Sequence, residues 1–374
     1  MDKRKYIVYI GSKKYYYDKV ADLCDIDLTP TFLELVKESD ECRQRKESFE
    51  DYADILLIPN DNYNGITEQA HDRIGAIIKE LTTNDAVIYI HNPPIVLKEY
   101  LKSISLENVR YYNEEYRMNK NERDFVENMS NISKQIIGQN PAIVNIGQSM
   151  WYLTKTNRQK PYVIMLYGNS SLGKTELVRK VAEKFYNNDY YEKHLSMFKN
   201  DTYSDYFFGE RPNRKTLGYD LLERKSNLIF LDEIDKCPEH FYSAFYTLFD
   251  NTLFKDASYE ADISGLLIIL TSNYMNHDEM KKKLGIPIYY RIDKFIYFSD
   301  FTPKTIYEIT IKEIQEKYPD FEKWYTSEQI YSVVSSKINT KNENARTIKN
   351  KIQEVIEELL FEQIKSDFEK NKYI

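Results

Sequence analysis

The stretch YVIMLYGNSSLGKTELVRKVAEKF, residues 162–185, decides the fold of this chain. Its first six residues are apolar or aromatic and predict a buried strand, while residues 175–185 follow a helical pattern. Residues 168–175, GNSSLGKT, match the pattern G-x-x-x-x-G-K-[ST] between the two. Glycines let backbone N–H groups wrap around an anion, and a helix N-terminus adds partial positive charge. The stretch therefore predicts a phosphate-binding loop.

The residues of this loop have distinct expected roles toward ATP. Lys174 is expected to reach the β- and γ-phosphates, and the hydroxyl of Thr175 is expected to bind Mg²⁺. A chance match to so short a pattern is the alternative, and the strand before and the helix after the loop disfavour it. The candidate nucleotide-binding residues of the loop are Gly168, Asn169, Ser170, Ser171, Leu172, Gly173, Lys174 and Thr175.

Two later strands end in polar residues that suit the same site. The apolar run 228–231 is followed by Asp232, expected to hold Mg²⁺ with Thr175, and by Glu233, expected to orient and activate the attacking water. The run 266–270 is followed by Thr271-Ser272-Asn273, and the Asn273 amide is a candidate to hold that water. The alternatives are an ordinary acidic strand end and an asparagine turn.

Together these segments resemble the AAA+ superfamily, in particular its Clp-type branch of ring-shaped unfoldases, over about residues 135–374. The segments that carry the resemblance are GKTELVRKVAEKFY (173–186), LIFLDEIDK (228–236) and LTSN (270–273). The resemblance implies that Ile136 and Ile137 lie against adenine. It also implies that Asn273 is the residue that this family calls sensor 1.

Two arginines extend the resemblance. Tyr290-Arg291-Ile292-Asp293 is similar to the R-I-D segment of Clp proteins, which implies that Arg291 is a finger reaching the γ-phosphate of a neighbouring subunit. Asn344-Ala345-Arg346 is similar to their G-A-R segment, which implies that Arg346 contacts the nucleotide as sensor 2. Guanidinium groups suit the charge that spreads over phosphate oxygens in the transition state. For each arginine alone, a solvated charge is the alternative. The resemblance implies a homo-oligomer, with a hexamer as the expected ring.

The predicted fold is α/β: an AAA+ P-loop ATPase domain (135–300) with a helical small domain (301–374), preceded by a small N-terminal domain (1–115) and a partly helical linker (116–134). In the N-terminal domain, apolar runs at 6–10, 53–59, 86–90 and 108–112 alternate with helical patterns at 66–81 and 97–103. Such alternation predicts a parallel sheet. The turn after the first strand, Gly11-Ser12, suggests a flavodoxin- or TIR-like arrangement.

One segment departs from the Clp pattern. Clp unfoldases grip a threaded chain with an aromatic-glycine pore loop, whereas residues 207–220 read FFGERPNRKTLGYD and are shorter. Gly218-Tyr219 is a weak remnant of that element. Arg211, Arg214 and Lys215 could instead face an acidic partner or nucleic acid, and a solvated loop is the alternative.

Composition narrows the class of protein further. The net charge of −7 does not indicate a general nucleic-acid binder, although it leaves a local basic patch open. Cys24, Cys42 and Cys237 form no CxxC pair, so neither a zinc site nor a disulfide framework is expected. The chain has no apolar run long enough to span a membrane and no secretory signal pattern, so a cytoplasmic location without membrane attachment is expected.

Three functions remain open. The first is an ATP-driven motor that remodels a macromolecular partner, most readily a protein, because ATP binding alone would need neither Glu233 nor Arg291. The second is an ATP-dependent oligomerisation switch or scaffold, in a defence setting for example, whose N-terminal domain senses or recruits a partner. The third is an N-terminal enzyme gated by assembly, for which Glu68 and His91 are the candidate residues.

Overall fold

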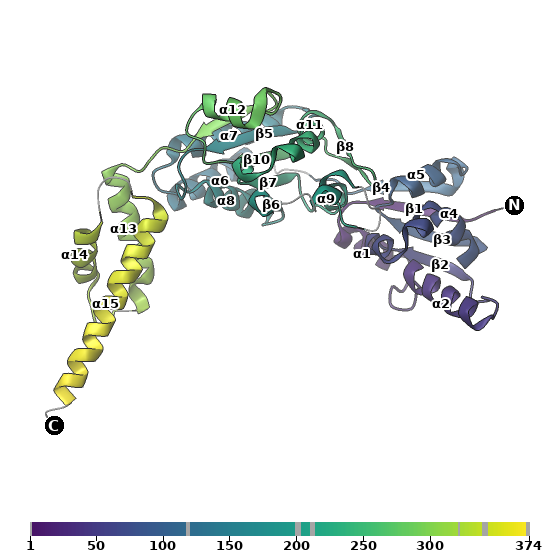
Figure 1. The fold of residues 1–374 in the computed structure, drawn as a ribbon, viewed down its shortest axis with the longest axis horizontal. Helices are drawn as coiled ribbons and strands as arrows, with labels where there is room; N and C mark the ends of the chain where they lie inside the picture. The colour runs from purple at the N-terminus through teal and green to yellow at the C-terminus, as the bar shows by residue number, and fades with distance from the viewer. Residues whose placement is uncertain are drawn as a thin grey trace.

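The computed structural model describes residues 2–116, 120–198, 203–209, 214–320, 322–338 and 343–371. Figure 1 shows three successive parts along an extended arch: an N-terminal α/β part, a central α/β part and a C-terminal helical bundle. Within the described ranges, no helix combines the length and the apolar character that crossing a bilayer requires.

The N-terminal part is built on a four-stranded sheet in which every pairing is parallel. Its strands, in the spatial order β2-β3-β1-β4, are β1 (Lys5–Ile10), β2 (Ala53–Ile58), β3 (Thr82–His91) and β4 (Val109–Asn113). The four strands predicted from apolar runs are thus confirmed, and so is the parallel α/β class. The order differs from the 2-1-3-4 arrangement of flavodoxin-like sheets, because the chain returns after β2 and inserts β3 between β2 and β1. The alternation of strands and helices predicts parallel pairing but carries no information on this order.

Helices cover both faces of this sheet. They are α1 (Lys13–Ala21), α2 (Phe32–Arg45), α3 (Glu68–Asp72), α4 (Ile74–Leu81) and α5 (Ile95–Lys102). The aromatic helix α1 buries Tyr16 and Val20 against one face, while α2, α4 and α5 form the core on the other. The single helical face predicted over 66–81 is wrong in one respect, because Arg73 (φ −109°, ψ 9°) separates α3 from α4.

Most of the segment predicted as a linker, residues 116–134, is a packed helix. α6 (Glu122–Gln135) begins at Asn121, whose side chain accepts hydrogen bonds from two backbone N–H groups of its first turn. Its Phe125 and Ile132 are buried in the core that α7 (Asn140–Lys155) and α8 (Lys174–Tyr186) share. The charged side chains that suggested a linker occupy the outer face of an amphipathic helix.

The central part contains a five-stranded parallel sheet, in the order β11-β5-β10-β7-β6. Its strands are β5 (Tyr162–Tyr167), β6 (Tyr191–His194), β7 (Leu228–Asp232), β10 (Leu267–Thr271) and β11 (Lys294–Tyr297). The three inner strands are fully or nearly fully buried apolar runs, as a sheet covered on both faces requires. Alternate residues of these strands enter two separate cores, one shared with α6, α7 and α8 and one with α10, α11 and α12.

The remaining elements of the central part border the sheet. They are α9 (Ser204–Phe208), α10 (Leu217–Leu222), α11 (Tyr242–Asp250), α12 (His277–Tyr289) and an antiparallel pair, β8 (Leu253–Lys255) and β9 (Glu260–Asp262). Gly218 and Tyr219, the weak remnant of a pore loop, lie within α10. Arg211 lies outside the described residues.

The C-terminal bundle consists of α13 (Pro303–Lys317), α14 (Ser327–Lys337) and α15 (Ala345–Asn371). α13 begins where Thr302 caps its first turn and Pro303 occupies its first position. The apolar stripe Ile348, Ile352, Val355 and Ile356 of α15 packs against Ile306, Ile309 and Ile314 of α13 and against α14. The switch from strands to helices after residue 300 agrees with the expected helical small domain.

Candidate functional site

The loop between β5 and α8 depends on glycine at a defined position. Gly168 has φ 131°, and a Cβ built on it would lie 2.4 Å from the carbonyl oxygen of Phe298. Gly173 has φ 96°, and Ser171 also has a positive φ, 59°. These conformations wind the backbone into a loop whose Leu172 is anchored in the core. The N-terminus of α8 follows directly, so backbone N–H groups and the helix dipole act at one place.

Lys174 lies at the centre of this loop and is buried. Its Nζ donates to the carbonyl oxygens of Gly168 (2.7 Å) and Asn169 (2.6 Å) and to Oδ1 of Asn273 (3.3 Å). Burial lowers the pKa of Lys174 from its ordinary value of 10.5 to about 8, against the opposing influence of Asp235, Asp232 and Glu233. The ammonium group is therefore held among carbonyl dipoles that a phosphate could replace.

The carboxyl ends of β7 and β10 bring the predicted acidic and amide residues to this loop. β10 lies between β5 and β7, so residues that follow these strands meet at one edge of the sheet. Thr175 Oγ1 is 3.4 Å from Asp232 Oδ1. Both are hard oxygen ligands of the kind that Mg²⁺ prefers, and Mg²⁺ usually keeps several waters. The residues present thus fit the predicted magnesium site.

Thr271 belongs to the site, although its place in the sequence predicts no role for it. Its hydroxyl donates a hydrogen bond to Asp232 Oδ1 and accepts one from the backbone N–H of Glu233 at 2.9 Å. Glu233 itself is half-buried and has left-handed backbone angles, φ 58° and ψ 53°. Thr271 thereby fixes the carboxylate of Asp232 and the backbone of Glu233 at the end of β7. The only sequence signal was its position directly before Ser272-Asn273 at a strand end.

His194 is a further residue beside the site that the sequence did not predict. It ends the edge strand β6, pairs in register with Asp232, and its Nδ1 lies 3.2 Å from Asp232 Oδ2. The strand is only four residues long and half-buried, so it has no apolar run that would have revealed it. Asp235, which follows β7, accepts a hydrogen bond from the backbone N–H of Asn273 at 3.3 Å.

The other residues of the loop face outward. Asn169 and Ser170 are exposed, and Asn169 Nδ2 donates to Asp300 Oδ1 at 2.7 Å. Asp300 lies at the end of the central part of the chain, three residues before α13 begins. The loop therefore contacts the segment that joins the sheet to the helical bundle.

The helical bundle also reaches this loop. The backbone N–H of Ala345, at the start of α15, donates to the carbonyl oxygen of Ser171 at 3.1 Å. Arg346 is the next residue and is exposed. Ile136 is buried 3.9 Å from the position of a Cβ on Gly173, and Ile137 packs against the core of the bundle. The structure thus gathers the predicted adenine-side residues and the first turn of α15 around the loop.

The side chain of Arg291 contacts α11 and α12. Its Nη1 donates to the carbonyl oxygen of Pro287 at 2.8 Å, its Nε lies 3.5 Å from Asp250 Oδ2, and its guanidinium sits 4.9 Å from the ring centroid of Tyr246. These partners belong to α11 and α12, and the side chain remains 31% exposed. None of these described contacts of Arg291 involves the phosphate-binding loop of its own chain.

The chain is similar to a known family and to a known protein. The family described as AAA domain (Cdc48 subfamily) matches residues 159–369. The AAA+ ATPase ClpV1 of Pseudomonas aeruginosa is 29% identical over 172 residues, which cover 42% of this chain and 19% of that protein. The chain thus spans about a fifth of the length of this relative. The region that matches the family, residues 159–369, holds the phosphate-binding loop, the strand ends at Asp232–Glu233 and at Asn273, and most of the helical bundle.

Proposed function

Because the chain belongs to the AAA domain (Cdc48 subfamily) family, which matches more than half of its length, we propose that it binds and hydrolyses ATP and works as a homo-oligomeric ring. The predicted kinship with Clp-type AAA+ ATPases is confirmed by the same findings. Family membership implies nucleotide binding and ATP hydrolysis, with Mg²⁺ as the usual companion ion. The ring, its partner and the role of each residue are our proposals.

The observation that carries the proposal is the convergence of Lys174, Asp232 and Asn273 on one loop. Lys174 Nζ is bonded to two loop carbonyls and to Asn273, and Asp232 approaches Thr175 from the neighbouring strand end. A structural lysine would gain little from burial beside three carbonyl or amide oxygens at a depressed pKa. A lysine that receives phosphate oxygens would gain its counter-charge on binding.

Each side chain then has one task in hydrolysis. Lys174 and the loop N–H groups hold the β- and γ-phosphates, while Thr175 and Asp232 would hold Mg²⁺, which neutralises phosphate charge when bound. Glu233, fixed through its N–H by Thr271, orients the attacking water and accepts its proton. Asn273 orients the same water or the γ-phosphate.

The residues around the base and the outer phosphates come from two directions. Ile136 and Ile137 line the adenine side, and Arg346 approaches from the bundle, because Ala345 is already bonded to the loop. Arg291 is partly exposed and bound only to groups of α11 and α12 in its described contacts, which suits a finger that acts on a neighbouring subunit. A site completed by a neighbour makes turnover depend on assembly.

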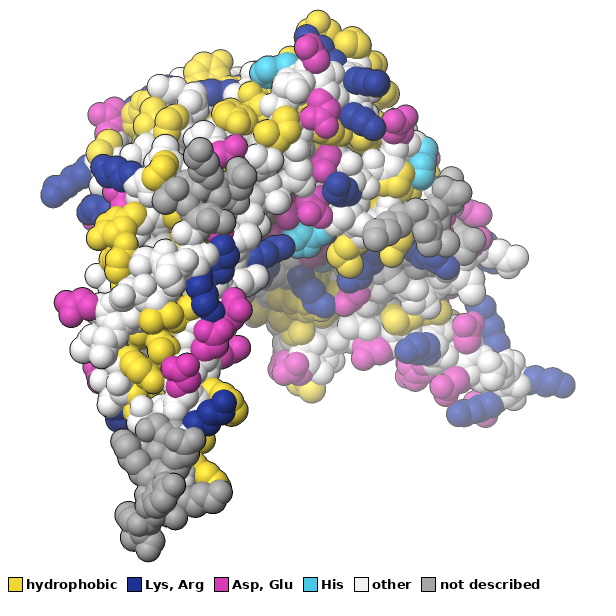
Figure 2. Space-filling view, turned by 60° about the vertical axis from the view of Figure 1, so that its left-hand side comes forward, with side chains coloured by type: hydrophobic (Ala, Val, Ile, Leu, Met, Phe, Trp, Pro, Cys, Tyr) yellow, Lys and Arg dark blue, Asp and Glu magenta, His cyan; other side chains and the backbone are white. Residues whose placement is uncertain are grey.

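The partner is a macromolecule, and a protein suits the surface better than nucleic acid does. The net charge is −7, and Figure 2 shows Lys and Arg side chains interspersed with Asp and Glu on the face that it displays. Of the predicted loop cations, Arg214 already lies 3.3 Å from Asp205, and Lys215 is exposed.

A second candidate function is an ATP-dependent switch or scaffold, and the packing of α10 favours it. Tyr219 is only 5% exposed and its ring packs edge-on against that of Tyr259. Gly218 is also buried, and its N–H donates to Asp256 Oδ2 at 3.0 Å. Neither residue is free to grip a threaded chain, and this weakens the hypothesis that α10 acts as a pore loop of a motor.

The test is a partner capture with the full chain. Glu233→Gln is expected to bind ATP without hydrolysing it and so to hold its partner, while Lys174→Ala, which should not bind ATP, is the matched control. Bound proteins are identified by mass spectrometry. Many unrelated unfolded clients on Glu233→Gln alone would support a motor, and a single dominant partner would support a switch. Absence of Mg²⁺-dependent ATP hydrolysis by the purified wild-type protein, at any concentration up to that of a stable oligomer, would refute the proposal.

A further inference from the structure

The carboxyl edge of the N-terminal sheet is lined by buried polar residues. His91 ends β3 and is followed by Asn92, Gly11 follows β1, and Asn60 begins the 3₁₀ turn after β2 (η1, Asn60–Gly65). Open parallel sheets bind ligands at this edge, where the chain leaves adjacent strands toward opposite faces. Here the chain leaves β1 into α1 on one face and leaves the neighbouring β3 into α5 on the other. The crevice between β1 and β3 is therefore the expected ligand position.

A carboxylate from the central part of the chain fills this crevice. Glu223, which directly follows α10, accepts a hydrogen bond from the backbone N–H of Lys13 at 2.9 Å. It also accepts from Asn60 Nδ2 at 2.9 Å and from Asn92 Nδ2 at 3.2 Å. His91 Nε2 lies 3.6 Å away, and the Glu223 side chain is 19% exposed. Donors from the loops after three strands thus converge on one carboxylate.

The receiving groups are fixed by bonds other than those to Glu223. The Asn92 side chain both accepts from the N–H of Gly11 (3.0 Å) and donates to its carbonyl oxygen (2.8 Å), and Asn92 has a positive φ of 43°. His91 is stacked on Tyr16 with ring centroids 4.7 Å apart, and its Nδ1 accepts from the N–H of Asn60. The Nε2 atom of the same ring lies 2.9 Å from the carbonyl oxygen of Gly11, so the proton of the neutral ring lies on Nε2 and is donated to that carbonyl. Backbone strain at a buried residue is tolerated where the surroundings over-determine it, and such residues cluster at binding sites.

Asn60 supplies an independent sign of a ligand. Its side chain is 2% exposed, and its Oδ1 is buried without a hydrogen-bond partner among the described residues, although its Nδ2 is bonded to Glu223. A buried acceptor without a donor is costly, by about 1–3 kcal/mol for a typical group. An occupant that carries a hydroxyl or amino group beside its carboxylate would satisfy both atoms of this amide, which Glu223 does not.

The charges around the crevice select the kind of anion. Glu114 Oε2 accepts from the N–H of Ser12 at 2.6 Å and from the hydroxyl of Tyr116 at 2.9 Å, and Lys13 Nζ is already paired with Asp61 at 2.7 Å. Two carboxylates therefore flank the crevice, and the ammonium group of Lys13 is already paired with one of them. A doubly charged phosphate would meet more repulsion here than a singly charged carboxylate.

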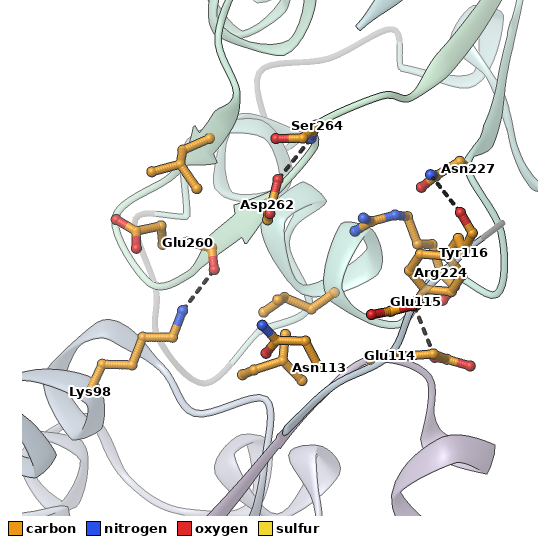
Figure 3. Close-up of a pocket in the computed structure, with 14 residues that line it drawn as sticks. Lys98, Asn113, Glu114, Glu115, Tyr116, Arg224, Asn227, Glu260, Asp262 and Ser264 are labelled. Carbon is orange, nitrogen blue, oxygen red and sulfur yellow. Dashed lines mark hydrogen bonds between the residues drawn. The ribbon is translucent and has the colours of Figure 1, made fainter. Parts of the chain in front are cut away.

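Beside the crevice lies a cavity of about 450 Å³ between the N-terminal and central parts of the chain. Figure 3 shows Lys98 and Asn113–Tyr116 entering it from the N-terminal side, opposite Arg224, Asn227, Glu260 and Asp262. Gly11 and Glu114 line both the cavity and the edge of the sheet. The cavity therefore has room for the remainder of a small molecule whose carboxylate enters the crevice.

We propose that the N-terminal domain is a receptor for a small hydroxy- or amino-carboxylate, and that Glu223 occupies its site as an intramolecular substitute. The ligand displaces Glu223 and thereby loosens the contact between the N-terminal and central parts of the chain. The other hydrogen bonds of this contact include those from the Ile95 N–H to the Ser258 carbonyl (2.9 Å) and from Lys98 Nζ to the Glu260 carbonyl (2.8 Å). Glu223 precedes β7 (Leu228–Asp232), so its release acts on the strand that ends at the nucleotide site.

The test uses the full chain with Glu223→Ala and with Glu239→Ala, an exposed glutamate of the same domain, as control. Glycolate, acetate and inorganic phosphate are titrated by calorimetry without ATP, so the result does not depend on ATPase activity. An intramolecular competitor acts at an effective concentration of about millimolar. We therefore expect Glu223→Ala to bind glycolate at least about tenfold more tightly than Glu239→Ala or wild type does, and more tightly than it binds acetate or phosphate.

Location is checked by hydrogen exchange and by a second variant. Glycolate should protect the backbone of residues 11–16 and 89–93 in Glu223→Ala, and adding Asn60→Ala should abolish both the protection and the preference for glycolate over acetate. If Glu223→Ala does not fold, Glu223→Gln takes its place, since it keeps the shape and removes the charge. No binding by a folded variant, binding that Asn60→Ala does not affect, or a preference for phosphate would each overturn the proposal.

Discussion

ATP binding should be accompanied by uptake of a proton onto Lys174, and the pH dependence of that uptake is the sharpest test of the site. Burial holds the pKa of Lys174 at about 8 in the protein without nucleotide. The fraction of this lysine that lacks its proton is then about 0.1 near pH 7 and about 0.9 near pH 9.

Phosphate oxygens at Nζ reverse the effect of burial. A full negative charge about 4 Å away contributes about 4 kcal/mol at an effective dielectric constant of about 20, which corresponds to about three pKa units. The pKa of Lys174 in the complex should therefore rise again to at least its ordinary value of 10.5. The sign follows directly: because the pKa rises on binding, ATP binding takes up protons between the two values, and affinity falls as the pH rises through about 8.

Titration calorimetry in pairs of buffers with different ionisation enthalpies measures this uptake. We expect about 0.1 proton per ATP near pH 7 and about 0.9 near pH 9. The control is Lys180→Ala, which removes a lysine of the same helix that is paired with Glu183 and should leave the uptake unchanged. Buffer-independent heats near pH 9 would refute the assignment of Lys174 as the phosphate-binding cation, provided that ATP binds.

Three further predictions concern the geometry of the site. Gly168→Ala should abolish ATP binding and lower the free energy of unfolding by about 1–3 kcal/mol or more, because the new Cβ meets the Phe298 carbonyl at 2.4 Å and the residue keeps a φ of 131°. Thermal melts with and without ATP measure the stability and the binding, and unaltered ATP binding would contradict the close approach. Thr271→Val should keep ATP binding but slow ATP turnover at least about tenfold, because a buried hydroxyl that fixes Asp232 and the backbone of Glu233 is lost. Thr252→Val, in the turn before β8, is the control, and turnover at the wild-type rate by Thr271→Val would contradict the positioning role of Thr271. Arg291→Ala should bind ATP normally and hydrolyse it about 10³-fold more slowly. When the variant is mixed with wild-type protein, the ATPase activity should fall by more than the fraction of variant subunits, and a strictly proportional loss would argue against action on a neighbouring subunit.

The local part of the site could be predicted from sequence because its residues are contiguous. Residues 168–175 specify the loop, since glycine is needed at Gly168 for the backbone to pass Phe298. The apolar run before the loop predicts a buried strand, and the helical pattern after it predicts a covering helix. The sequence also predicted that Asp232, Glu233 and Asn273 belong to the site, because the carboxyl ends of parallel strands meet at one edge of a sheet. The parallel class of the N-terminal sheet followed from the same alternation of strands and helices.

Only the tertiary structure decided which distant residues join these sites. His194 reaches Asp232 because β6 lies beside β7, and a short half-buried strand carries no apolar signal of its own. Strand order placed β1 beside β3, and the docking of the central part brought Glu223 to Lys13, 210 positions away. Hydrophobic periodicity records which face of each element is buried, but the free energy that selects a neighbour comes from packing between elements. A sequence therefore specifies loops, strands and helices locally, and the contacts between domains remain a property of the folded chain.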